Sequence, residues 1–224
     1  MTARAQLELP DEPRWVEAHG IVADPTSWRR ALGRGFAVGH DGARLIVIAG
    51  DADRSALEAL AREFPSHAML LSTRELEPAI RGASRTLARA LIHTLADPEG
   101  LPDLEGAIRL PADASLAHLP RPLADELAAA RTPIWTVYVD GEPATFAYAS
   151  WRSPRWFDVS VDTLVTARQL GLGTLVASAL IRDERALGRE PVWAADEDNR
   201  ASLALARRLG FAPVDEIWVA PPAG

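Results

Sequence analysis

The feature that most constrains the fold is a run of three extended segments in the second half of the chain, followed by a glycine-bearing loop. The segments are Ile134–Val139, Ala144–Trp151 and Trp156–Leu164. Asp140 and Gly141 separate the first two, and this dipeptide is a strong signal for a two-residue hairpin turn. The order predicts an antiparallel three-stranded meander that leads into a loop and a helix.

The third segment carries an unusual polar row. Alternation along a strand places Asp158, Ser160 and Asp162 on one face, together with Trp156 and Leu164. A central strand is normally apolar on both faces, so the row is a candidate functional surface. The alternative is structural, because a carboxylate on a strand also pairs with arginine or faces solvent.

The loop after this strand has the features of an anion site. Gly171 and Gly173 precede the apolar stripe of a helix and remove side chains that would block a phosphate, and Arg168 offers charge-assisted hydrogen bonds. The first N–H groups of a helix are unpaired and lie at the positive end of its dipole. A dinucleotide-binding loop would need a third glycine where Val176 stands.

Composition removes several other chemistries. The 224 residues include 0 Cys, and all 24 Lys+Arg positions are Arg. A chain without thiols has no disulfide and no cysteine nucleophile, and one without Lys has no Schiff base and no Walker A loop. The 5 His are scattered without metal-ligand spacing, so we expect no metal.

The charge argues against nucleic acid as a partner, since the formal net charge is −7. Residues 1–100 carry 12 Arg against 14 acids, and residues 101–224 carry 12 against 17. The excess acid in the second half suits a cationic substrate, and solubility explains it equally well. No apolar run approaches the roughly 18 residues of a membrane span. The first ten residues carry acid and proline, unlike a signal peptide, so we expect a cytoplasmic protein.

A turn-rich connector at residues 97–102 divides the chain. We expect residues 1–100 to form a small α/β domain, although they show no chemical motif, and the chain shows no internal repeat. Its elements are expected to be a hairpin of 36–38 with 45–49, a helix over 53–64, a strand at 68–71 and a helix over 76–80 cut short by Pro78 and Gly82. Residues 85–95 are ambiguous between strand and helix.

Residues 101–224 are expected to form a second α/β domain with a mixed sheet. Besides the meander, its pattern predicts strands at 107–110, 191–195 and 217–219 and helices over 122–131, from 174 to Leu187, and over 202–209. Gly188 and Gly210 stand where glycines commonly end a helix.

This order of parts resembles the GNAT superfamily of acyl-CoA N-acyltransferases, over about residues 104–219. The family's loop motif, Arg/Gln-x-x-Gly-x-Gly/Ala, is met by Arg168, Gly171 and Gly173. Its second signature is Asn, then small or apolar residues, then Leu-Gly-Phe. The residues that meet it are Asn199, Ser202, Leu203, Leu205, Leu209, Gly210 and Phe211. The resemblance implies an α/β GNAT fold in the C-terminal half.

The resemblance also implies acetyl-CoA as co-substrate. The amides of 169–174 would hold the pyrophosphate, and backbone groups of 163–165 would pair with the pantetheine arm and direct an N–H at the thioester oxygen. Asn199 would hydrogen-bond the same arm. The implied set of binding residues is Thr163, Leu164, Val165, Arg168, Gln169, Leu170, Gly171, Leu172, Gly173, Thr174, Asn199 and Ser202.

An attacking amine must be neutral, so a base is needed. We expect Asp158 to fill this role directly or through water, with Asp162 as the second candidate. Many family members have a Tyr four residues after the Ser202 position to protonate the leaving thiolate, and Ala206 stands there. Ser202 or water then substitutes, or the thiolate leaves unassisted.

The resemblance implies an N-acetyltransferase that moves an acetyl group directly to a primary amine of a small molecule. The N-terminal domain is then expected to cover the acceptor side, and a homodimer is compatible with the sequence. The alternative is a non-catalytic acyl-CoA-binding regulatory module, which the absence of the tyrosine at Ala206 favours.

Overall fold

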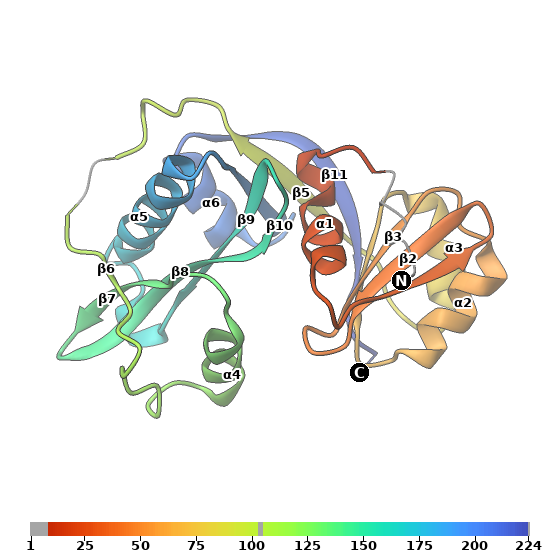
Figure 1. Cartoon of the computed structure of the whole chain (residues 1–224), viewed down its shortest axis with the longest axis horizontal. Coiled ribbons are helices and arrows are strands. Elements are labelled where there is room, and N and C mark those ends of the chain that lie inside the picture. The colour runs from red at the N-terminus through yellow and green to blue at the C-terminus, as the bar shows by residue number, and fades with distance from the viewer. Residues whose placement is uncertain (1–8, 103–104, 224) are drawn as a thin grey trace. The chain divides into compact units, whose positions relative to one another are not determined.

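A computed structural model of the chain describes residues 9–102 and 105–223, so the first eight residues, positions 103 and 104 and the last residue lie outside it. The chain forms two compact units, coloured along the sequence in Figure 1. Among the described residues, unit 1 comprises 9–92, Ala195–Asn199 and 214–223, and unit 2 comprises 93–102, 105–194 and Arg200–Pro213. This division of the chain differs from the single boundary expected near residue 100, because the end of the last strand, β11, pairs with β4 within unit 1.

In unit 1 the strands follow the order β1-β2-β3-β4-β11. Its elements are α1 (Val16–Ala23), β1 (Trp28–Leu32), β2 (Gly35–His40), β3 (Leu45–Ala49), α2 (Arg54–Glu63), β4 (Ala68–Leu71), α3 (Glu77–Gly82), the first part of β5 (Ala88–Leu95) and the end of β11 (Phe211–Ala220). Short 3-10 helices cover Pro13–Trp15 and Arg74–Leu76. The strands β1, β2 and β3 are antiparallel, and β4 is parallel to β3.

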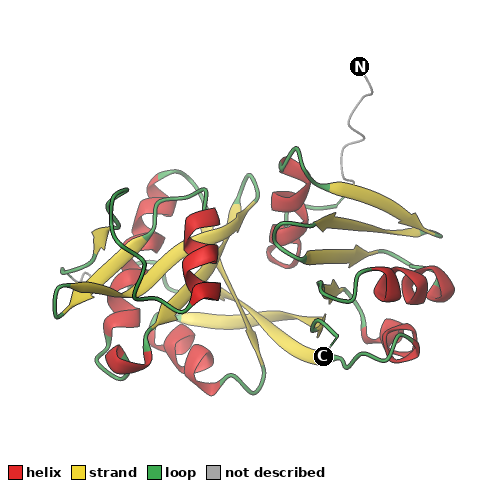
Figure 2. Cartoon of the chain, turned by 90° about the horizontal axis from the view of Figure 1, so that it is seen from below, coloured by secondary structure: helices red, strands yellow, loops and turns green. Residues whose placement is uncertain are grey.

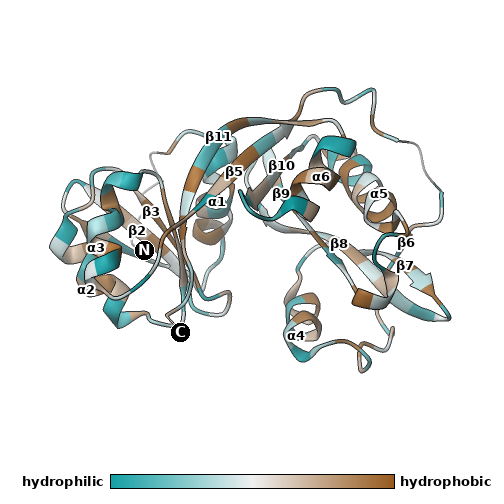
Figure 3. Cartoon of the chain, turned by 180° about the vertical axis from the view of Figure 1, so that it is seen from behind, coloured by the Kyte–Doolittle hydropathy of each residue, from teal (hydrophilic) through white to brown (hydrophobic). Residues whose placement is uncertain are grey.

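The apolar core of unit 1 forms where α2 packs against β3. Leu57 and Leu60 of α2 are fully buried against Ile46 and Ile48 of β3, as the 3.6-residue spacing of the helix requires. Figure 3 shows these strands mainly apolar and the outer surfaces of α2 and α3 mainly hydrophilic. Asp53 caps α2 by accepting a hydrogen bond from the Ala56 amide.

The local predictions for this half are mostly confirmed. The hairpin, the helix and the strand at 68–71 are present, and the ambiguous 85–95 segment is the strand β5. One expectation is wrong: Pro78 does not shorten the helix, because it lies in the first turn of α3, where no N–H is required. Two elements, α1 and β1, were not predicted.

Unit 2 has strand order β5-β10-β9-β8-β7-β6. Its elements are β6 (Ile108–Arg109), α4 (Arg121–Ala129), β7 (Trp135–Val139), β8 (Glu142–Arg152), β9 (Trp156–Thr163), the 3-10 helix Val165–Ala167, α5 (Leu172–Ala186), β10 (Glu190–Asp196), α6 (Arg200–Arg208) and the ends of β5 and β11. The meander is confirmed, since β7, β8 and β9 pair antiparallel and β10 runs parallel to β9. Asp140 and Gly141 both have positive φ, as a type I′ turn demands.

Helices cover both faces of the unit 2 sheet (Figures 1 and 2). Phe146 and Tyr148 of β8 pack with Leu127 of α4 on one face. On the other face α5 lies so close that a Cβ added at Gly173 would stand 3.7 Å from Val161 of β9. The two faces of β9 therefore meet different helices, with α4 on the side of Tyr148 and α5 on the side of Val161.

Candidate active site

The centre of the site is an opening between strands β9 and β10. The two strands pair over only three positions, the last of which joins Asp158 to Val192. Beyond it β9 continues to Thr163 and β10 to Asp196 without further pairing to each other. The edge of β9 that faces away from β8 is therefore open from Val159 onwards.

The direction of the amides along this edge follows from the pairing of β9 with β8. The Leu164 N–H donates to the Ala144 carbonyl at 2.9 Å, so it points towards β8. Successive amides of a strand point to opposite sides, so the N–H groups of Thr163 and Val161 point into the opening. The sequence assigned backbone contacts to 163–165, and the Leu164 amide is already used within the sheet.

The loop from Arg168 to Gly171 leads into the N-terminus of α5 at the end of β9. Gly171 is the N-cap residue with φ 76°, and Gln169 also has a positive φ of 64°. No side chain caps α5 and its first turn holds no acid, so its first amides remain available for an anion. The Thr174 amide is not among them, because it donates to the Gly171 carbonyl at 3.1 Å.

The two loop glycines serve different purposes. Open space surrounds Gly171, and its positive φ is the reason for glycine there. At Gly173 a Cβ would stand 3.1 Å from the Leu205 side chain, so this glycine allows α6 to approach α5. Arg168 is exposed, and its Nε donates to the Thr163 carbonyl at 3.4 Å.

Asp158 lies at the apex of the opening, on the face of β9 that carries the polar row. Burial raises the pKa of its carboxyl to about 7. Among the described residues, no arginine forms an ion pair with Asp158. A carboxyl group with a pKa near neutrality can accept a proton at physiological pH.

The rest of the polar row continues across the strands on the same face. Tyr148 of β8 donates a hydrogen bond to Asp162 at 3.2 Å, and the hydroxyls of Ser150 and Ser160 lie in hydrogen-bond contact. Burial and the nearby charge of Glu126 in α4 raise the pKa of Asp162. Burial, a hydrogen bond to Glu126 and the charge of Asp162 raise the pKa of Tyr148. The face is therefore acidic and partly shielded from water.

The residues of the second sequence signature divide between the two units. Asn199 is exposed and belongs to the Ala195–Asn199 segment of unit 1, whereas Ser202 belongs to unit 2. The Ser202 hydroxyl accepts a hydrogen bond from Trp193 Nε1 at 2.9 Å. Ala206, at the position of the family's tyrosine, is fully buried in α6.

Sequence reasoning missed three neighbours of the polar row: Glu126, Tyr148 and Ser150. The signal that finds them is the strand register, which sets Tyr148 opposite Ser160 and therefore on the same face. Glu126 stands on a predicted helix whose packing face the sequence did not fix.

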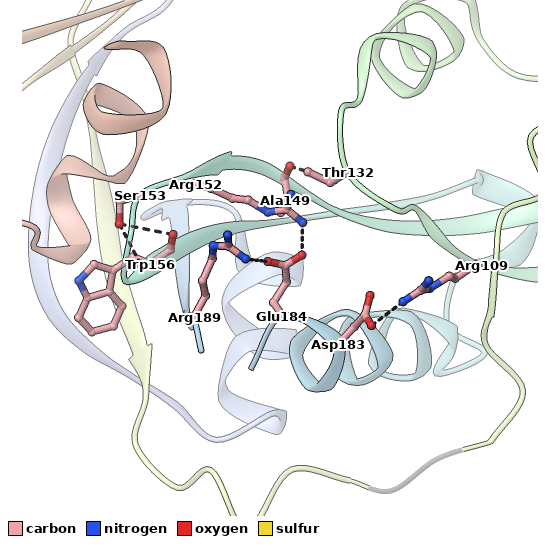
Figure 4. Close-up of polar contacts among 9 residues, drawn as sticks. All are labelled: Arg109, Thr132, Ala149, Arg152, Ser153, Trp156, Asp183, Glu184 and Arg189. Atoms are coloured by element: carbon pink, nitrogen blue, oxygen red, sulfur yellow. Dashed lines mark hydrogen bonds and ion pairs between the residues drawn. The ribbon is translucent and has the colours of Figure 1, made fainter. Parts of the chain in front are cut away.

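A buried charge cluster holds the other end of the β8–β9 hairpin. Glu184 of α5 is fully buried and accepts hydrogen bonds from Arg152 and from Arg189, the latter at 3.4 Å, as Figure 4 shows.

In the described part of the chain, no helix is long and apolar enough to cross a membrane. The same residues contain no group of three His, Cys, Asp or Glu side chains suited to a metal ion.

Residues 136–219 match the family model described as GNAT acetyltransferase. No curated protein matches the chain. Among solved structures, a GCN5-related N-acetyltransferase-like protein from Streptococcus suis 89/1591 has a TM-score of 0.66 at 14% identity, over 96% of this chain and 94% of that one. A GCN5-related N-acetyltransferase from Kribbella flavida has a TM-score of 0.64 at 16% identity, over 94% and 95%.

At these identities the solved structures establish the fold alone, and they do so over nearly the whole chain. The family match covers the meander, the glycine loop, α5, β10 and α6, which are the elements that form the opening and its candidate anion site. Residues 136–219 therefore resemble the acetyltransferase domain of the GNAT superfamily, and the chain has the fold of the GNAT proteins compared above.

Proposed function

We propose that the protein transfers an acetyl group from acetyl-CoA to a primary amine of a small molecule, with Asp158 as general base. The observation that carries the proposal is the position of Asp158 at the apex of the β9–β10 opening, with a pKa raised to about 7. At pH 7 such a carboxyl is about half ionised, and its proton affinity is far above that of an exposed aspartate.

The residues of the opening fit acetyl-CoA. The free N–H groups of the β9 edge suit an extended amide-bearing arm, which would add to the sheet as another strand. The uncapped α5 N-terminus and Arg168 suit a diphosphate. When bound, acetyl-CoA supplies the acetyl thioester, and this chain positions the acceptor beside it and takes up the proton.

The acceptor amine forms the new N–C bond with its lone pair as the C–S bond breaks. The amine proton passes to Asp158, directly or through one water molecule, and the electron pair of the C–S bond leaves with the sulfur. Most of the rate gain then comes from positioning and from timely removal of this proton. Ala206 offers no proton donor, so the leaving thiolate receives its proton from water, either directly or through the Ser202 hydroxyl, which takes up a proton from water in return.

The acidic face supports a cationic small molecule as acceptor. Asp162 and Glu126 lie on the same side of the sheet as Asp158, and their charges raise the local concentration of an ammonium-bearing substrate. The alternative function, a non-catalytic acyl-CoA-binding module, is favoured by the buried alanine at the position of the usual tyrosine.

One assay separates the two functions. The protein holds 0 Cys, so a thiol-reactive dye reports released CoA without background from the chain. Release of CoA over a panel of primary amines, with tight acetyl-CoA binding by calorimetry, supports the enzyme. Tight binding without release for any amine supports the binding module. Absence of binding, with no effect of Asn199→Ala, contradicts both.

A further inference from the structure

The two halves of the chain have the same order of elements. In the N-terminal half, α1 precedes the antiparallel strands β1, β2 and β3, followed by α2, the parallel strand β4, α3 and β5. In the C-terminal half, α4 precedes the antiparallel strands β7, β8 and β9, followed by α5, the parallel strand β10, α6 and β11. The repeat includes the connections that determine topology: an antiparallel meander, then a helical crossover to a parallel strand.

The correspondence extends to the turns. Two residues join the first and second strands of each meander, Gly33-Arg34 in one half and Asp140-Gly141 in the other. In each half a glycine with φ 76° stands between the third strand and the next helix, Gly50 before α2 and Gly171 before α5. The sequence shows no repeat because these shared features are backbone geometry and strand pairing, which unrelated residues can satisfy.

The last strand of each half ends in the unit formed mainly by the other half: β5 ends in unit 2, and β11 ends in unit 1. The last three paired residues of β11 join β4 in unit 1, with Val219 opposite Leu70. The end of β5 lies in unit 2, where the His93 ring nitrogen Nδ1 is 3.3 Å from the Trp193 carbonyl oxygen. Just beyond β5, the Ala96 amide donates to the Gly210 carbonyl at 3.0 Å.

The two helix N-termini that correspond in this repeat differ in charge. Asp53 caps α2 and accepts hydrogen bonds from the Ala56 amide and the Ser55 hydroxyl, which lower the pKa of Asp53 and keep it ionised. Asp51 adds a second carboxylate in the same connection. By contrast, α5 starts at a glycine and has no acid in its first turn. Asp51 is already paired with Arg34, so a diphosphate at α2 would meet an occupied amide and the ionised carboxylate of Asp53.

We infer that the N-terminal half is a second copy of the acyltransferase fold unit that has lost its acyl-CoA site, and that the two copies have exchanged their last strands within one chain. Each chain then binds one acyl-CoA, at α5. The identity of this ligand rests on the proposed function, whereas the strand exchange does not.

The number of sites is measured by titrating the full-length chain with acetyl-CoA in a calorimeter. We expect one molecule per chain. Leu172→Asp, which places an acid in the first turn of α5, is expected to weaken binding at least tenfold. Asp51→Asn with Asp53→Ser, which keeps a capping oxygen, is the matched change at α2 and is expected to leave the affinity at α5 unchanged. Two molecules per chain would overturn the loss of the second site, and no binding at all would overturn the proposed function.

The exchange is tested by cross-linking, which needs no ligand. The chain has 0 Cys, so Leu70→Cys with Val219→Cys introduces the only two thiols, at positions opposite each other on β4 and β11. With diamide as oxidant, we expect a disulfide within the monomer, seen as faster migration on a non-reducing denaturing gel. Leu70→Cys with Ala220→Cys is the control, because its side chains lie on opposite faces. No cross-link in the first pair, or a cross-linked dimer, would overturn the exchange within one chain.

Discussion

Asp158 of β9 stands opposite Val192 of β10 at the last position where the two strands pair. Before this position the strands are held together, and after it the edge of β9 is open. A carboxyl group at this point is shielded by the paired part of the sheet and adjoins the opening where a thioester and an amine would meet. The raised pKa of Asp158 and its proposed role both follow from this placement.

Replacing Asp158 with Asn is expected to lower kcat/KM for acetyl transfer roughly a hundredfold or more, because the general base is lost. The wild-type rate is expected to fall as the pH drops below about 7, where Asp158 becomes protonated, and the variant is expected to lack this dependence. CoA release measured between pH 5.5 and 9 gives both results. Asp162→Asn is the matched control on the same strand face, and loss of the pH dependence in this control but not in Asp158→Asn would assign the base to Asp162 instead.

The same substitution is expected to stabilise the protein in a pH-dependent way. The pKa of Asp158 is about 7 in the folded state and near 4 in the unfolded state, so the wild type loses stability as the pH rises from about 4 to 7. The amide of the variant does not titrate. The Tm of Asp158→Asn is therefore expected to exceed that of the wild type by an amount that grows from pH 4 to 7 and then levels off. A difference in Tm that stays constant with pH would contradict the raised pKa.

A double-mutant cycle between Gly173 and Leu205 tests the role of this glycine in packing. A Cβ at position 173 stands 3.1 Å from the Leu205 side chain, so Gly173→Ala sets a gain in helix propensity against a clash. In a Leu205→Ala background the clash is absent, and we expect Gly173→Ala to be more favourable there by about 0.5 kcal/mol or more. Additive free energies of unfolding would show that the two side chains do not interact.

Glu184 and its neighbour Asp183 on α5 provide a comparison between a buried and an exposed ion pair (Figure 4). Glu184 is fully buried between Arg152 and Arg189, so Glu184→Gln is expected to cost about 3 kcal/mol or more, because it leaves buried charge uncompensated. Asp183 pairs with Arg109, whose side chain is 59% exposed, and Asp183→Asn is expected to cost below about 1 kcal/mol. Urea unfolding of both variants measures the difference, and equal costs would contradict it.

The shared strands are expected to make the chain unfold as one cooperative unit, because neither sheet is complete without residues from both halves. Leu57→Ala, in the core of unit 1, is expected to reduce the free energy of unfolding by about 2 to 5 kcal/mol. It is expected to lower the midpoint temperature of a single calorimetric transition. Two separate transitions, of which only one moves in Leu57→Ala, would show that the units unfold independently.

The sequence predicted most of the local structure of the C-terminal half. Asp140-Gly141 has few conformations available and determines the β7–β8 hairpin, and alternation along 156–164 predicts the face that Asp158, Ser160 and Asp162 share. Gly171 was predicted as part of an anion-binding loop. It occupies the N-cap position of α5, where no side chain accepts a hydrogen bond from the first helix amides. These features depend on residues close together in the chain, so their physical causes are visible in the sequence.

The sequence misread features that depend on distant partners. Gly173 was assigned to phosphate approach, yet its nearest neighbour is Leu205 on another helix. The backbone groups of 163–165 were assigned together to the pantetheine arm, and within this stretch the Leu164 amide bonds to Ala144 of β8. In both cases a contact between residues far apart in sequence determines what the group does.

The sequence by itself determined the resemblance to the GNAT superfamily, the order of strands and helices in the second half, and the candidate base at Asp158. These rest on short-range patterns of turn residues, polar alternation and motif spacing. Only the tertiary structure decided that β9 and β10 part at Asp158, that Tyr148 and Glu126 join the polar row, and that β5 and β11 end in different units. Strand pairing and burial set these relationships, and they arise between segments up to about 150 residues apart, which no local pattern encodes.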